Sequence, residues 1–174
     1  MSFSKPSLYV YHRFEDDPKK CTSSKLLRFG LLRNIHPRNF NNKSLILNPF
    51  SREVINPLDH YLELRKIVVI DCSWKKINNT FNKKMKGINK RLPILVAGNP
   101  TNYAKPSALS SVEALSACLI IIGYDDHARE LLSKFKWGNT FLTLNEELLI
   151  SYQNAANEQE ILKIEKEYFP NLYT

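Results

Sequence analysis

The run Ile67-Val68-Val69-Ile70 constrains the fold of this chain more than any other segment. It is apolar at four consecutive positions, so a strand built from it has no polar face to present to water. Such strands lie inside parallel sheets that are covered on both faces. The pattern therefore predicts an α/β fold with a parallel sheet. The chain contains three further strand patterns and, between the strands, two helical ones: Leu8–Tyr11, Ser44–Asn48, Leu92–Ala97, Ser24–Arg33 and Pro57–Lys66.

The sequence changes character after Gly98, because only helical patterns follow. Ser110 and Glu113 form a capping box, which opens an apolar helix that ends at Gly123. Further helical patterns cover residues 126–135, 142–155 and 157–169. We therefore predict two domains: a basic α/β N-terminal domain at residues 1–92 and an all-helical C-terminal domain at residues 93–174.

The positive charge lies almost entirely in the first of these parts. Residues 1–92 contain 19 Lys and Arg against 7 Asp and Glu, whereas residues 93–174 contain 6 against 10. Clustered cations favour a polyanionic partner, because binding to phosphates releases counterions. The alternative is a Lys-rich surface that contacts only water. The candidate RNA-binding residues are Lys19, Lys20, Lys83, Lys84 and Lys86.

Several kinds of chemistry have no support in the sequence. The three cysteines and four histidines show no metal-ligand spacing, so we expect no metal site and reduced thiols. Neither a glycine-rich phosphate loop nor a G-x-S-x-G elbow occurs. The polar start predicts no signal peptide, and the longest apolar run, Ala117–Ile122, is too short for a bilayer. We expect a cytoplasmic monomer without a membrane partner.

Ligands of open α/β sheets bind beyond the carboxyl ends of the strands. Trp74 follows a buried strand and could form a flat wall against an aromatic ring, or it could plug the edge of the core. Asp71 ends the same strand and could accept a proton or face a cation. Its alternative role is the N-cap of a following helix.

A set of short motifs extends over nearly the whole chain and resembles a known family. The motifs are Asp16-Asp17-Pro18-Lys19-Lys20-Cys21-Thr22, Leu47-Asn48-Pro49, Val69-Ile70-Asp71-Cys72-Ser73-Trp74, Leu92-Pro93-Ile94-Leu95-Val96-Ala97-Gly98-Asn99-Pro100, Leu109-Ser110-Ser111-Val112-Glu113-Ala114 and Phe135-Lys136-Trp137-Gly138. Together they resemble the ribosome-biogenesis aminocarboxypropyltransferases of archaea and eukaryotes, which modify 16S or 18S rRNA.

The resemblance implies both an activity and a fold. The co-substrate would be S-adenosylmethionine, whose 3-amino-3-carboxypropyl group is transferred to a uridine or pseudouridine of small-subunit rRNA or of the pre-ribosomal small subunit. Methylthioadenosine would be the other product, and no metal would take part. The implied fold is a parallel-sheet N-terminal domain with a SPOUT-like trefoil knot, followed by an all-helical C-terminal domain.

The resemblance also implies roles for single residues. Adenine would lie between Leu47, Pro49 and Trp74 on one side and Leu95 and Leu109 on the other. The backbone carbonyl of Ile70 would bind the ribose, and the amides of Thr22 and Ser111 would hold the amino-acid tail. Asp71 would be the catalytic base or an electrostatic partner. Two alternatives stay open: a SPOUT-like RNA methyltransferase and a non-catalytic rRNA-binding assembly factor.

Overall fold

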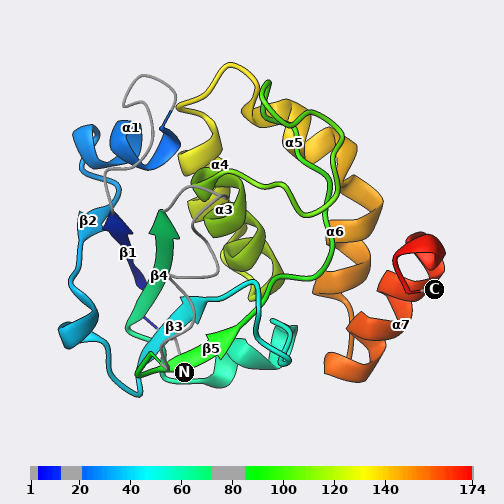
Figure 1. Cartoon of the computed structure of the whole chain (residues 1–174), viewed down its shortest axis with the longest axis horizontal. Helices are drawn as coiled ribbons and strands as arrows, with labels where there is room; N and C mark the ends of the chain where they lie inside the picture. The colour runs from blue at the N-terminus through cyan, green and yellow to red at the C-terminus, as the bar shows by residue number, and fades with distance from the viewer. Residues whose placement is uncertain (1–3, 13–20, 72–84, 174) are drawn as a thin grey trace.

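The structure is a computed structural model of the chain, and it describes residues 4–12, 21–71 and 85–173. Within these residues the strands form one five-stranded sheet, and all neighbouring strands are parallel. The order across the sheet is β2-β1-β4-β3-β5 (Figure 1). The strands are β1 (Ser7–His12), β2 (Arg33–Asn34), β3 (Ser44–Leu47), β4 (Lys66–Asp71) and β5 (Ile88–Lys90).

The apolar run of β4 is buried on both faces of the sheet. Alternate residues of a strand point to opposite faces. Ile67 and Val69 belong to a large core that includes residues of the helices, whereas Val68 and Ile70 belong to a smaller cluster with Ile35, Phe40 and Ile46. The prediction of a parallel strand covered on both faces is confirmed at this position.

The predicted capping box of Ser110 and Glu113 is present at the start of α3 (Ser111–Ile121), the first described helix of the second half. The Ser110 hydroxyl accepts from the Glu113 amide, and the Glu113 carboxylate accepts from the Ser110 amide. None of the described helices is long and apolar enough to cross a membrane. The α-helices are α1 (Thr22–Arg28), α3 (Ser111–Ile121), α4 (Asp125–Leu132), α5 (Gly138–Leu144), α6 (Glu146–Gln153) and α7 (Glu158–Tyr168), and the 3-10 helices are Pro37–Asn39, Pro57–Tyr61 and Pro170–Leu172.

The expected fold class, a SPOUT-like trefoil-knotted domain followed by a separate all-helical domain, is wrong. The chain is an α/β fold, and within the described residues one five-stranded parallel sheet and the helices share the larger of the two apolar clusters. Helix α3 has no polar face directed to solvent, because nine of its 11 residues are buried, Glu113 and Ser116 among them. It packs against β4, α4 and α6 (Figure 1), and so joins the helices to the sheet. The division into domains at residues 92 and 93 stays a prediction.

The segment Leu92–Ala97, expected as the last of four strands, is not a strand of the sheet, and the strand at this point of the chain is β5 at Ile88–Lys90. Side chains from distant helices satisfy the segment's backbone. The Asn145 side chain exchanges two hydrogen bonds of 2.8 Å with Val96, and the Tyr152 hydroxyl donates to the Ile94 carbonyl at 2.9 Å. Glu165 accepts from the Ile94 amide at 2.8 Å. The segment is therefore held by α6 and α7 rather than by a strand ladder.

The burial of His127 in α4 should make the protein less stable at acidic pH. The residue is 9% exposed, and its Nδ1 has no hydrogen-bond partner among the described residues. Burial, and secondly the charge of Lys5, lower the pKa of His127 to about 4, although Glu130 acts in the opposite direction. The unfolded chain takes up this proton near pH 6.5 and the folded chain only near pH 4, so the free energy of unfolding should fall as pH drops through this window.

Between pH 6.5 and pH 4 the free energy of unfolding should fall by on the order of 1–3 kcal/mol less in His127→Phe than in the unmodified protein. Urea unfolding at several pH values measures it. His36→Gln, at an exposed position before the first 3-10 helix, is the control and should leave the slope unchanged. An identical slope in His127→Phe and the unmodified protein would contradict the assignment.

Candidate functional site

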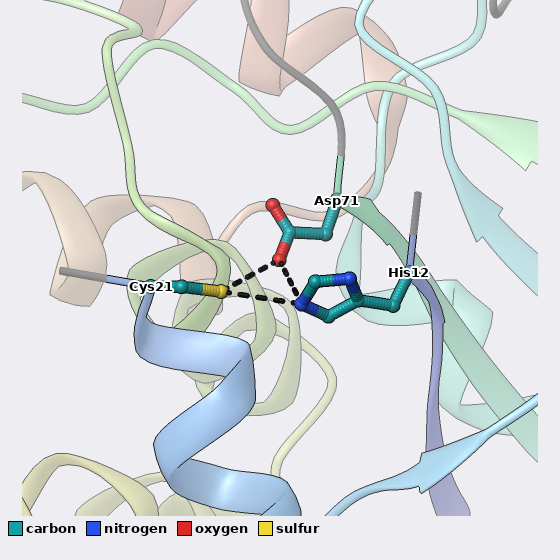
Figure 2. A group of neighbouring side chains, drawn as sticks. All are labelled: His12, Cys21 and Asp71. Carbon is teal, nitrogen blue, oxygen red and sulfur yellow. Dashed lines mark hydrogen bonds and ion pairs between the residues drawn. The ribbon is translucent and has the colours of Figure 1, made fainter. Parts of the chain in front are cut away.

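The neighbouring strands β1 and β4 run parallel and end side by side. We call the side of the sheet where the strands end its carboxyl edge. In the parallel register His12, the last residue of β1, is paired with Asp71, the last residue of β4. Cys21 lies immediately before α1 and caps it, because its sulfur accepts from the Ser24 amide. Figure 2 shows the three side chains pointing toward one another from these three elements.

Asp71 is held by several donors through a single oxygen. Its Oδ2 lies 3.0 Å from the Cys21 Sγ and 3.4 Å from the His12 Nε2, and it accepts a short hydrogen bond from the Ser23 hydroxyl. The side chains of His12 and Asp71 are only 4% and 11% exposed. Among the described residues all these contacts reach Oδ2, and Figure 2 shows Oδ1 pointing away from Cys21 and His12. The cluster therefore holds the carboxylate through Oδ2, with Oδ1 directed away from Cys21 and His12.

Cys21 is a hydrogen-bond donor in this cluster. Burial, and secondly the hydrogen bond with Asp71, raise the pKa of the Cys21 thiol. Its sulfur also lies 3.0 Å from the Ser23 hydroxyl and 3.4 Å from the His12 Nε2. At neutral pH the thiol is protonated, and its S–H group donates a hydrogen bond to the Asp71 carboxylate. This agrees with the raised pKa of the thiol.

The predicted tail-binding residues Thr22 and Ser111 are brought together by a contact between two helix starts. Thr22 is the first residue of α1, and its hydroxyl accepts at 3.2 Å from the amide of Val112 in the first turn of α3. Ser111 is the first residue of α3. Amides in the first turn of a helix have no partner within that helix and attract carboxylates. This junction adjoins Cys21 and so borders the Asp71 cluster.

The predicted adenine-binding residues divide into a buried set and an exposed one. Leu47 and Leu95 belong to the same core, and the half-buried Leu109 packs against it. Pro49 is exposed just beyond β3. Trp74 lies outside the described residues. The side chain of Ile70 faces the opposite cluster of the sheet, so its predicted role concerns only the backbone.

The predicted RNA-binding lysines are mostly outside the described residues, namely Lys19, Lys20, Lys83 and Lys84. Lys86 is exposed and precedes the amino end of β5. Asp71 lies at the carboxyl end of β4, and these two strand ends belong to opposite edges of a parallel sheet. The structure therefore does not bring Lys86 next to Asp71.

The turn Gly98-Asn99 holds a carboxylate of the protein. Its two amides donate at 2.7 and 3.0 Å to Oε1 of the fully buried Glu113. The anion that they bind is therefore a carboxylate of the protein itself. The sequence identified Glu113 only as a helix cap, and nothing local shows that it also binds a turn 14 residues earlier.

Sequence reasoning missed His12, Cys21 and Ser23 as parts of the site. The spacing of His12 and Cys21 matches no metal or catalytic motif. Their only signal was the position of Cys21 in the Asp-Asp-Pro-Lys-Lys-Cys-Thr motif and of His12 at the end of a strand pattern. The strand pairing that places His12 opposite Asp71 could not be read from the sequence.

Two families match parts of the sequence. The family described as "Ribosome biogenesis protein, C-terminal" matches residues 45–169, and the one described as "Possible Fer4-like domain in RNase L inhibitor, RLI" matches residues 6–38. The second segment contains a single cysteine, Cys21, whereas a four-iron cluster requires four thiolates. Residues 6–38 therefore lack the ligands for such a cluster.

Several known proteins match this chain over nearly the whole length of both sequences. The 16S rRNA aminocarboxypropyltransferase of Methanothermobacter thermautotrophicus is 45% identical over 164 residues, which cover 92% of this chain and 97% of that protein. The one from Methanocaldococcus jannaschii is 44% identical over 168 residues, covering 94% and 96%. The solved structure of the SAM-dependent rRNA:acp-transferase Tsr3 from Vulcanisaeta distributa has a TM-score of 0.81 at 37% identity, covering 93% of this chain and 91% of that one.

Proposed function

The chain belongs to the 16S rRNA aminocarboxypropyltransferase family, and from this premise we propose that it transfers the 3-amino-3-carboxypropyl group of S-adenosylmethionine to a uridine or pseudouridine of small-subunit rRNA. The observation that supports this most is the match over 93% of the chain to a structure described as a SAM-dependent rRNA:acp-transferase. The matching family of ribosome biogenesis proteins supports a precursor of the small subunit as the natural substrate.

The described residues fit the co-substrate in chemistry. Leu47, Leu95 and Leu109 are apolar residues of one cluster, suited to adenine, and Pro49 and Trp74 would complete that surface. The Ile70 carbonyl would accept from the ribose. These are the roles expected for a mostly apolar pocket with few polar groups.

The amino-acid tail would be held where α1 meets α3. The amides of Thr22 and Ser111 are at helix starts, and the hydrogen bond from the Val112 amide to Thr22 keeps the two starts together. The bound co-substrate supplies a sulfonium, whose adjacent carbons are open to attack. Which carbon reacts depends on orientation, so a fixed tail position would determine which group is transferred.

Asp71 would receive the proton of the attacking base. Because Oδ2 is occupied by Cys21, Ser23 and His12, the carboxylate is oriented with Oδ1 outward. A carboxylate fixed in this way can remove a ring N–H proton as the new bond forms, or stabilise the charge that develops.

Two labelled co-substrates test the activity. We expect carboxyl-labelled S-adenosylmethionine to label 16S rRNA and methyl-labelled S-adenosylmethionine to leave it unlabelled, with methylthioadenosine as the second product. Labelling from the methyl group would show the alternative methyltransferase. RNA binding without either label, and without binding of S-adenosylmethionine, would show a non-catalytic assembly factor.

The basic residues of the first half should set the salt dependence of RNA binding. Replacing Lys19 and Lys20, or Lys83, Lys84 and Lys86, by Ala should weaken binding of a small-subunit rRNA hairpin. Each lost phosphate contact should reduce the slope of log affinity against log salt by about 0.7–0.9. Titrations at several salt concentrations measure this.

The control for the lysine variants is Lys163→Ala, an exposed residue of α7 in the acidic half. It should leave the slope unchanged, and none of the variants should alter binding of S-adenosylmethionine. Unchanged slopes in both sets of lysine variants would mean that these side chains contact only water.

A further inference from the structure

Three different metal-ligating atoms meet at the carboxyl edge of the sheet. They are the His12 Nε2, the Cys21 Sγ and the Asp71 Oδ2, and all lie within 4.8 Å of one another. The S···N, S···O and N···O distances are 3.4, 3.0 and 3.4 Å. Each ligand comes from a different element, and Figure 2 shows them converging on one point.

We propose that His12, Cys21 and Asp71 bind a divalent cation of the zinc class. Bonds of about 2.0–2.3 Å to a tetrahedral ion separate its nitrogen, oxygen and sulfur ligands by about 3.3–3.6 Å. The two contacts of His12 already have this spacing, and the sulfur–oxygen pair needs to open by about half an ångström. Three protein ligands leave the fourth position for water or another ligand.

The donor set selects the kind of ion. Magnesium and calcium take oxygen ligands, so a thiol and an imidazole disfavour them. Thiolate and imidazole together suit zinc and similar transition metals. The single cysteine of residues 6–38 supports one ion here rather than an iron–sulfur cluster.

Groups around the ligands are arranged as supports for a bound metal. The Ser24 amide donates to the Cys21 sulfur at 3.4 Å, a contact that stabilises a thiolate. The Ser23 hydroxyl contacts Asp71. The Ser24 hydroxyl lies 3.1 Å from the His12 Nε2, and a metal bond to that nitrogen would replace this contact. When the ion binds, the thiol proton of Cys21 leaves to solvent and the S–H···O contact becomes two metal bonds.

Metal binding and the proposed role of Asp71 exclude one another, and this consequence alone rests on the proposed function. A carboxylate bound to a cation is a poor proton acceptor, because the positive charge favours its ionised form. The metal-bound protein should therefore be inactive in transfer. The expectation from sequence that the protein binds no metal is replaced by this proposal.

The test is a titration of the full chain with CoCl₂ after treatment with a chelator. We expect one Co²⁺ per chain, a thiolate-to-cobalt charge-transfer band and the visible bands of tetrahedral Co²⁺, all displaced by ZnCl₂. Cys21→Ser should abolish the charge-transfer band and weaken binding at least about 100-fold. Cys118→Ala, in the buried part of α3, and Cys72→Ala should keep the band.

Absence of the band in the unmodified protein would overturn the site, as would a band that depends on Cys72 or Cys118 and survives in Cys21→Ser. His12→Ala gives a second test, because it should weaken binding while leaving the thiolate in place. These readouts need no transfer activity, so they fail or succeed independently of the proposed reaction. In an active preparation, ZnCl₂ should then inhibit transfer, and chelator should restore it.

Discussion

Asp71→Asn is expected to lower the rate of aminocarboxypropyl transfer by roughly 10²–10⁴-fold, the range that a positioned general base contributes. The asparagine side chain keeps the shape of the aspartate and can still accept from Cys21 and Ser23 through its oxygen. It cannot take up a proton from the attacking base. Because this role arises only as the transition state forms, binding of S-adenosylmethionine should change by less than about 10-fold.

Single-turnover transfer from carboxyl-labelled co-substrate measures the rate, and calorimetry measures binding. Asp126→Asn is the matched control, since Asp126 is an exposed aspartate at the start of α4. Its rate should equal that of the unmodified protein. Should Asp71→Asn instead lose its fold and co-substrate binding together, Asp71 is structural and the proposed role fails.

The sheet was predictable where burial determines residue type. The run Ile67–Ile70 is uninterrupted because its alternate residues enter two different apolar clusters, and that pattern is visible in the sequence. The same reasoning failed at Leu92–Ala97. This segment is just as apolar, but its backbone is satisfied by Asn145, Tyr152 and Glu165, which lie far along the chain. Composition cannot distinguish these two ways of burying an extended segment.

The separate helical domain was predicted for a related reason. The sequence shows that α3 is apolar, but it does not show what encloses it. In the structure one side of α3 meets β4, so the sheet and the helices form one core. A helix without a polar face is a sign of contacts on all sides, and the sheet was the available surface on one of them.

The candidate site was half predictable. Asp71 follows from the rule that ligands bind at the carboxyl ends of parallel strands. His12 and Cys21 are 59 and 50 residues away from it, and they reach it through strand register and through the start of α1. These contacts join segments far apart in the sequence, so no local sequence pattern predicts them.

Glu113 links the two ends of the loop that carries Leu109, which we call the 98–110 loop. Its Oε1 accepts from the amides of Gly98 and Asn99. Its Oε2 accepts from the Asn99 side chain at 2.8 Å and from the amide and hydroxyl of Ser110, both at 2.7 Å. The residue is fully buried. Removal of the carboxylate would leave the amides of Gly98, Asn99 and Ser110 without this acceptor.

We therefore expect Glu113→Ala to lower the free energy of unfolding by at least about 3 kcal/mol, because hydrogen bonds to a charged acceptor are strong and buried unpaired donors are costly. For a chain of this size the melting temperature should fall by roughly 6–12 °C. Glu113→Gln should be nearly as damaging, because its NH₂ group would face donors rather than acceptors. Urea and thermal unfolding measure both effects.

Glu160→Ala is the control, because Glu160 holds the same position in the first turn of α7 but is exposed. Its loss should cost less than about 1 kcal/mol. Binding of S-adenosylmethionine by Glu113→Gln, measured below its melting temperature, gives a second readout. Leu109 and Ser111 flank the Ser110 that Glu113 holds, so affinity should fall although Glu113 itself touches no ligand. Normal affinity in a destabilised Glu113→Gln would separate the 98–110 loop from the co-substrate site and remove Leu109 and Ser111 from it.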